Sequence, residues 1–137
     1  MNRTDLQKLA DIRIREAKTL FHAGEYSGSY YLAGYAVECA LKAWIAKRVQ
    51  RYDFPDKNLT QDSYVHDLGK LVKLADRSSE LVKAMRDNPR LTTIWDVVKA
   101  WTEQSRYSVC GKEEAEAIID AITRRNDGVL PWIKQRW

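Results

Sequence analysis

The sequence predicts an all-α fold: an up-and-down bundle of four to five main helices with short extra helices, in one domain over residues 1–137. Apolar residues recur at intervals of three and four along most of the chain, and no segment shows the alternation of a β-strand. Glycine, asparagine and proline interrupt this pattern at positions typical of helix ends. A chain of 137 residues also buries roughly two-thirds of its unfolded surface, which is enough for a core without disulfides.

The first two predicted helices should form an antiparallel hairpin. A helix over residues 4–23 ends at Gly24, because glycine readily takes the left-handed conformation of a C-terminal cap. A second helix over residues 27–51 follows after a turn so short that the two must be antiparallel neighbours. The apolar face of the second helix consists of Ala33, Ala36, Val37, Ala40, Leu41 and Trp44.

The middle of the chain predicts a loop and two short helices. Residues 52–64 are rich in proline, aspartate and asparagine, which favour turns. A helix over residues 66–75 follows, with His66 at its start as a cap or packing residue. Either Ser78 or Ser79 is expected to cap the next helix, since serine side chains accept hydrogen bonds from free backbone N–H groups.

Three further helices complete the predicted bundle. Asn88 followed by proline is typical of a helix start, and this helix is expected to run to about residue 105. The last long helix starts near Lys112, has glutamates in its first turn, and ends at residues 126–128. Residues 129–137 then form a short closing helix or tail.

Composition excludes several classes of protein. No run of about 18 apolar residues is present, and the N-terminus lacks the apolar core of a signal peptide, so we expect a cytoplasmic protein without a membrane span. Cys39 and Cys110 match neither a disulfide framework nor a zinc site, and no metal or cofactor motif occurs. The net charge of +4 permits contact with nucleic acid without demanding it.

The second predicted helix has an unusual second face, formed by Tyr31, Tyr35, Glu38 and Lys42. Glu38 and Lys42 have the spacing of a surface ion pair. In the alternative interpretation, the four residues face a dimer cleft and bind a ligand there. The tyrosines then either stack on bases or pack in a protein interface.

Three motifs lie in a fixed order along the chain. Residues 24–43 begin with Gly-Glu-Tyr and contain Ala-Val-Glu-Cys-Ala-Leu-Lys; His66-Asp67-Leu68 follows; Ser105-Arg106-Tyr107-Ser108 comes after a tryptophan-bearing helix. Together these motifs resemble the HEPN domain, a helical-bundle family that is widespread in prokaryotes. The resemblance covers nearly the whole chain and implies a bundle that is usually dimeric.

The resemblance also implies a functional setting. HEPN proteins are often partnered with a minimal nucleotidyltransferase in toxin–antitoxin-like gene pairs, and active members are metal-independent RNases. Those RNases use an arginine followed by a histidine after a short spacer, in a cleft at the dimer interface. Arg106 fits the arginine here, but Gly111, Lys112 and Glu113 stand where the histidine is expected. None of these three residues exchanges protons near neutral pH as imidazole does.

The sequence therefore leaves three functions open. The first is a homodimer that binds RNA or nucleotide, in a toxin–antitoxin-like or stress system, without RNase activity. The second is a metal-independent RNase with a rearranged site of Arg106, His66 and Tyr107. The third is a module that binds only proteins, through its aromatic face.

Two sets of charges test these alternatives. Arg106 either binds a phosphate or forms an internal ion pair, for which Glu38 is the expected partner. Two groups of basic residues would indicate nucleic-acid contact if they converged on one surface. They are Lys42, Lys47, Arg48 and Arg51 in one group, and Arg124, Arg125, Lys134 and Arg136 in the other.

Overall fold

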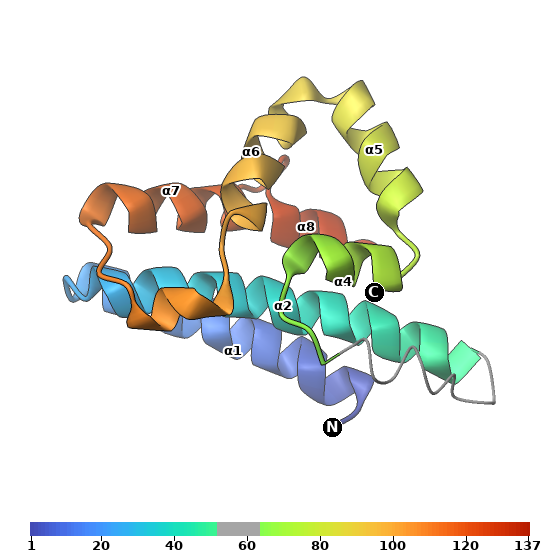
Figure 1. Ribbon diagram of the computed structural model, residues 1–137, viewed down its shortest axis with the longest axis horizontal. Coiled ribbons are helices and arrows are strands. Elements are labelled where there is room, and N and C mark those ends of the chain that lie inside the picture. Colours follow the sequence, from blue (N-terminus) through green and yellow to red (C-terminus); the bar gives the residue numbers. More distant parts are fainter. Residues whose placement is uncertain (52–63) are drawn as a thin grey trace.

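Two long antiparallel helices form the base of the molecule, and the shorter helices lie across them (Figure 1). The computed structural model describes residues 1–51 and 64–137, so most of the predicted loop at 52–64 lies outside the described residues. The described residues contain no strand, and the predicted all-α bundle is confirmed. In chain order the helices are α1 (Arg3–His22), α2 (Tyr26–Arg51), α4 (Leu68–Leu74), α5 (Ser78–Asp87), α6 (Pro89–Lys99), the 3-10 helix η1 (Glu103–Tyr107), α7 (Lys112–Thr123) and α8 (Val129–Lys134).

The predicted hairpin of the first two helices is confirmed, with ends within one residue of those expected. Gly24 has a φ of +82°, and the N–H groups of Gly24 and Glu25 donate to carbonyls in the last turn of α1. This is the glycine cap that the sequence predicted. The buried Ser29 hydroxyl donates to the Ala17 carbonyl over 2.7 Å, which joins the two helices.

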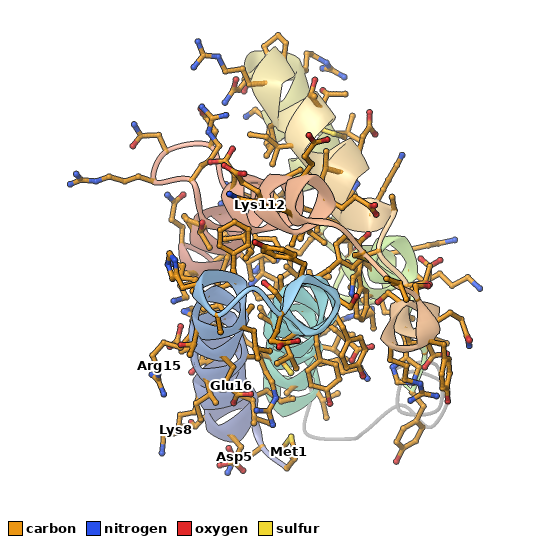
Figure 2. All side chains as sticks on the ribbon, turned by 90° about the vertical axis from the view of Figure 1, so that its left-hand side faces the viewer. Met1, Asp5, Lys8, Arg15, Glu16 and Lys112 are labelled. Carbon is orange, nitrogen blue, oxygen red and sulfur yellow. The ribbon has the colours of Figure 1, made fainter. Side chains whose placement is uncertain are left out.

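Helix α1 packs through one face only. Ala10, Ile14 and Ala17 are its buried residues, and their spacing matches the helical period. In Figure 2, which looks along the helix, the labelled side chains of Lys8 and Arg15 extend away from α2. Helix α1 therefore covers one side of α2 with its apolar face and presents charged residues to the solvent on its other face.

Two helix starts differ from the prediction. Helix α4 begins at Leu68 and not at His66, because the Asp67 side chain caps it by accepting from the Lys70 N–H over 2.9 Å. The expectation that Ser78 or Ser79 caps α5 is wrong: the cap position is Arg77, and its side chain makes no capping hydrogen bond.

Two helix ends also differ. The helix that begins at Pro89, capped by Asn88 as predicted, ends at Lys99 and not near residue 105. After this end the chain turns Trp101 into the core and continues as η1. Helix α7 ends at Thr123, three residues before the predicted stop, because Arg124 leaves the helical conformation with a ψ of 132°.

The core is centred on α2, whose predicted apolar face is completely buried. Cys39 is also buried, and burial raises the pKa of its thiol to about 11, so it acts as a small apolar residue. Among the described residues, no helix combines the length and apolar composition that a membrane span requires.

Gly34 lets Trp101 lie directly against α2. The Trp101 side chain is only 1% exposed, and a Cβ atom added to Gly34 would lie 2.3 Å from its ring. No side chain larger than hydrogen fits there without displacing the indole. The position of η1, which follows Trp101 directly, thus depends on this glycine.

We expect Gly34→Ala to lower the free energy of unfolding by about 1–3 kcal/mol, because the added methyl group overpacks the core. Urea denaturation of both proteins measures this change. Gly28→Ala on the same helix is the matched control, since its Cβ would meet only the end of the flexible Leu20 side chain, at 3.3 Å. In the control, stability should stay the same or rise by up to about 1 kcal/mol, because alanine favours helix over glycine. Equal losses in the two variants would contradict this account of Gly34.

Candidate functional site

The candidate site is a polar cluster built around Glu38, a residue of the predicted second face of α2. Glu38 is only 2% exposed, although it carries a carboxyl group. Its Oε1 lies 2.5 Å from Nδ1 of His66, in the segment that leads into α4. The other ring nitrogen of His66, Nε2, lies 3.1 Å from Oε2 of Glu103 in η1. One imidazole thus joins three separate segments of the chain.

Burial determines the electrostatics of Glu38. Removal from water raises the pKa of the Glu38 carboxyl, because an ionised group is poorly solvated inside a protein. Lys42, whose Nζ lies 4.0 Å away, and the hydrogen bond with His66 both act to lower this pKa. The ionised carboxylate is therefore tolerated only because two basic groups contact it.

His66 is held from both sides. A neutral imidazole has a single N–H, whereas the protonated ring has two, and an ionised carboxylate only accepts hydrogen bonds. Both contacts of His66 are hydrogen bonds when the ring carries a proton on each nitrogen. Both are also hydrogen bonds when Glu38 is protonated and donates to Nδ1, while the Nε2–H group donates to Glu103. In either case, neither ring nitrogen is free to bind a substrate.

The structure revises two expectations about these charges. The predicted ion pair between Glu38 and Lys42 is present but long, at 4.0 Å. The expected pairing of Glu38 with Arg106 is wrong: in the described residues Glu38 contacts His66 and Lys42 instead. His66 acts as the partner of the buried acid and not as the cap of α4.

The two tyrosines of the predicted ligand-binding face are used inside the protomer. The Tyr31 ring stacks on Trp101, with centroids 6.0 Å apart and an interplanar angle of 26°. The Tyr35 ring lies 6.0 Å from that of Tyr31, and burial raises the pKa of Tyr35. Both rings are half-buried, so only part of their surface could contact a ligand or a second protomer.

Arg106 and Tyr107 lie on the surface at the end of η1. The Arg106 guanidinium lies 4.9 Å from the centroid of the Tyr107 ring, and no ion pair involves it within the described ranges. Tyr107 is 74% exposed, and Val109, two residues on, is 95% exposed. A guanidinium has five N–H donors, so Arg106 can contact an anion outside the protomer.

The sequence did not predict that Glu103 belongs to this cluster. Glu103 lies in the stretch predicted to continue the helix from Pro89, and no motif marks it. One sequence signal could have indicated an earlier end of that helix, namely Trp101. A large aromatic residue near a helix end often turns into the core. That the chain would then bring Glu103 against His66 depends on packing alone.

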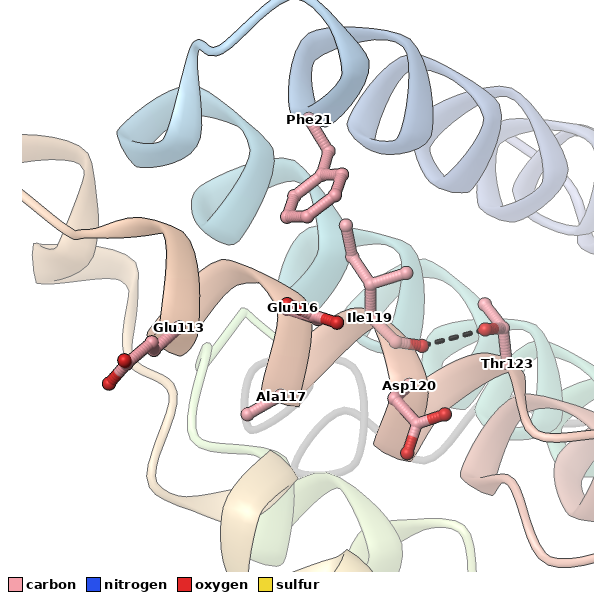
Figure 3. Close-up of a pocket in the computed structure, with 7 residues that line it drawn as sticks. All are labelled: Phe21, Glu113, Glu116, Ala117, Ile119, Asp120 and Thr123. Carbon is pink, nitrogen blue, oxygen red and sulfur yellow. Dashed lines mark hydrogen bonds between the residues drawn. The ribbon is translucent and has the colours of Figure 1, made fainter.

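Cavities open at several places on the described part of the molecule. One, of about 460 Å³, opens beside the cluster and is lined by both His66 and Glu103. A larger one, of about 620 Å³, lies between the end of α1 and helix α7 (Figure 3). Phe21 and Ile119 line the larger cavity, together with the acidic residues Glu113, Glu116 and Asp120. Its negative charge disfavours a phosphate, and it contains none of the predicted site residues.

The raised pKa of Glu38 predicts a dependence of stability on pH. The stabilisation from this group is complete below its usual pKa of 4.5 and is lost as pH rises through the raised folded-state pKa. The free energy of unfolding of the wild type, relative to Glu38→Gln, should therefore fall as pH rises above 4.5. Urea titrations of both proteins from about pH 4 to about pH 7 measure this difference. A relative gain by the wild type over this range would show that the folded state favours the ionised form.

Comparison with known proteins identifies the family of the chain. The HEPN domain family model matches residues 4–124 of the chain. No curated protein and no solved structure matches the sequence. The matched span contains the two motifs that meet at Glu38 and His66, as well as the motif that contains Arg106. The chain therefore belongs to the HEPN domain family.

Proposed function

We propose that this HEPN domain is a binding protein without RNase activity, which associates with RNA or nucleotide as a homodimer. The observation that carries the proposal is the double engagement of His66. Its two ring nitrogens contact Glu38 and Glu103, so the one imidazole in this cluster serves the fold.

RNA cleavage without a metal requires groups that remove and deliver protons at the reacting oxygens. Histidine suits this task at neutral pH, but none follows Arg106 at the spacing of active family members. Glu38 and Glu103 also place negative charge around His66, which opposes the approach of a phosphodiester. These observations support binding over catalysis.

Arg106 is the residue we assign to ligand contact. Its guanidinium is exposed and lies beside an exposed tyrosine ring, Tyr107. Arginine binds phosphate oxygens through paired hydrogen bonds, and a tyrosine ring can stack on an unpaired base. Tyr31, Tyr35 and Lys42 form the half-buried surface of α2 that we propose as the wall of the dimer cleft.

The cellular setting is also part of the proposal. The family assignment supports a cytoplasmic component of a toxin–antitoxin-like or stress system, with a minimal nucleotidyltransferase as partner. Purification of the tagged protein from its own host, followed by identification of co-purifying proteins, tests this partner.

The central experiment measures cleavage and binding of a labelled single-stranded RNA in the presence of a metal chelator. We expect no cleavage, and binding that weakens as salt increases. Arg106→Ala should weaken binding and reduce the slope of log affinity against log salt by about 1, because one phosphate contact is lost. Arg86→Ala is the control, since Arg86 is an exposed cation on α5, away from η1 (Figure 1). Binding that is equally strong in the wild type and Arg106→Ala would exclude Arg106 from the interface.

The same assay addresses a second candidate function, an RNase with a rearranged site of His66, Arg106 and Tyr107. The observation that favours it is that Glu38 orients Nδ1 of His66, an arrangement that carboxylates impose on catalytic histidines. Nε2 could then act only after Glu103 moves away from it. This candidate predicts cleavage that increases in Glu103→Gln and disappears in His66→Ala, and that result would contradict our proposal of inactivity.

The proposed homodimer should depend on the exposed apolar side chains of Tyr107, at the end of η1, and Val109, two residues later. Light scattering should show a dimer for the wild type and a shift toward monomer for Tyr107→Ser with Val109→Ser, because both side chains are exposed. Val82→Ser is the matched control, since Val82 is 50% exposed on α5. A dimer that both sets of substitutions leave intact would move the interface elsewhere. A dimer that binds no RNA or nucleotide would support the protein-binding alternative.

A further inference from the structure

A second concentration of positive charge lies near the C-terminal end of α2, at the opposite end of that helix from η1 (Figure 1). It surrounds a pocket of about 270 Å³ between α2, the turn after α4, and the start of α5. Lys47, Arg48 and Arg77 line the pocket, together with the acids Asp76 and Glu80. The lining side chains come from two regions that are far apart in the sequence, so only the fold brings them together.

Neutral backbone groups hold two of these cations. Lys47 Nζ donates to the carbonyl of Arg136 over 3.2 Å, and Arg48 Nη1 donates to the carbonyl of Leu74 over 2.7 Å. Neither contact neutralises the charge. An ammonium has three N–H donors and a guanidinium has five, so each side chain keeps further donors for a ligand.

Aromatic packing holds the third cation. The Arg77 guanidinium lies 5.3 Å from the centroid of the Trp44 ring, and the Trp44 indole N–H donates to the Ile133 carbonyl over 3.2 Å. Arg77 is therefore held over a ring that is itself fixed in the core. These contacts hold the three basic side chains in place without a ligand, which lowers the entropic cost of binding.

Glu80 is the internal counterion of this region. Its two carboxylate oxygens pair with Arg77 Nη1 at 2.5 Å and with Arg136 Nε at 3.0 Å. The Glu80 side chain is 43% exposed, so water competes for both contacts. A doubly charged anion that enters the pocket can replace Glu80 as the partner of Arg77.

We propose that this pocket binds a phosphate group in the form of a phosphomonoester. Three basic and two acidic side chains line this concave site, so basic groups are in excess. The N–H donors of arginine and lysine suit the oxygens of a phosphate. The volume of about 270 Å³ is below the range typical of whole drug-sized ligands, so a phosphate group fits while the rest of the ligand stays outside. This site is separate from the Arg106 surface and does not depend on the function proposed for it.

Isothermal titration calorimetry at low salt tests the site with four probes: inorganic phosphate, AMP, and one single-stranded RNA with either a 5′-phosphate or a 5′-hydroxyl. We expect saturable binding of at least one phosphomonoester probe. Lys47→Gln should weaken it about tenfold, because one charge-assisted hydrogen bond is lost. Glu80→Gln should tighten it, since the competing carboxylate is removed. Lys18→Gln, which removes an exposed charge on α1, is the control and should have no effect.

The outcomes separate the two sources of phosphate. Binding of inorganic phosphate and AMP indicates a small metabolite, whereas preference for the 5′-phosphorylated RNA indicates an RNA end, and both results support the site. Thermal melts confirm that each variant is folded, and tighter binding by Glu80→Gln cannot result from unfolding. Absence of saturable binding for every probe overturns the proposal, as does equal affinity in the wild type, Lys47→Gln and Glu80→Gln. Arg106→Ala should leave this binding unchanged, so failure of one proposal does not affect the other.

Discussion

A carboxyl group lies buried in the middle of the longest helix, and the surrounding segments are arranged to hold it. An ionised carboxylate inside a protein costs several kcal/mol unless basic groups contact it closely. Glu38 meets this requirement through Lys42 on its own helix and His66 from the segment before α4, and His66 in turn contacts Glu103 of η1. The need to satisfy this one acid therefore places two other segments against α2. It also explains physically why the Ala-Val-Glu and His-Asp-Leu motifs occur in the same chain.

Apolar packing one helical turn earlier supports the same arrangement. Trp101 lies against α2 only because Gly34 has no side chain, and the Tyr31 ring stacks on the indole. Burial of a large aromatic residue supplies much of the stabilising energy at such a contact. The polar cluster then selects one geometry among those that packing would permit, because an unpaired buried acid penalises the others. Packing and charge pairing thus act together on the position of η1.

This division of roles affects how function is assigned. Side chains that satisfy one another inside a protomer are poor candidates for catalysis, and His66 belongs to this class. Side chains that keep donors free at the surface are better candidates for binding, and Arg106 belongs to that class. The basic pocket near the other end of α2 combines both features, since Lys47 and Arg48 are ordered by carbonyl groups yet retain their charge. In both regions that we assign to ligands, basic side chains keep N–H donors that their contacts within the described residues do not use.

By itself, the sequence determined the helical class, the hairpin of α1 and α2, the buried face of α2 and the family, because helical periodicity and capping residues act over a few neighbouring positions. It misplaced the end of α6 and the cap of α5, where tertiary packing outweighs local preference. Only the tertiary structure decided that Glu38 contacts His66 and not Arg106, that Glu103 joins them, and that Lys47, Arg48 and Arg77 line one pocket. The physical reason is that contacts between helices depend on how each helix is rotated and where its loops return the chain. No short stretch of sequence specifies these properties.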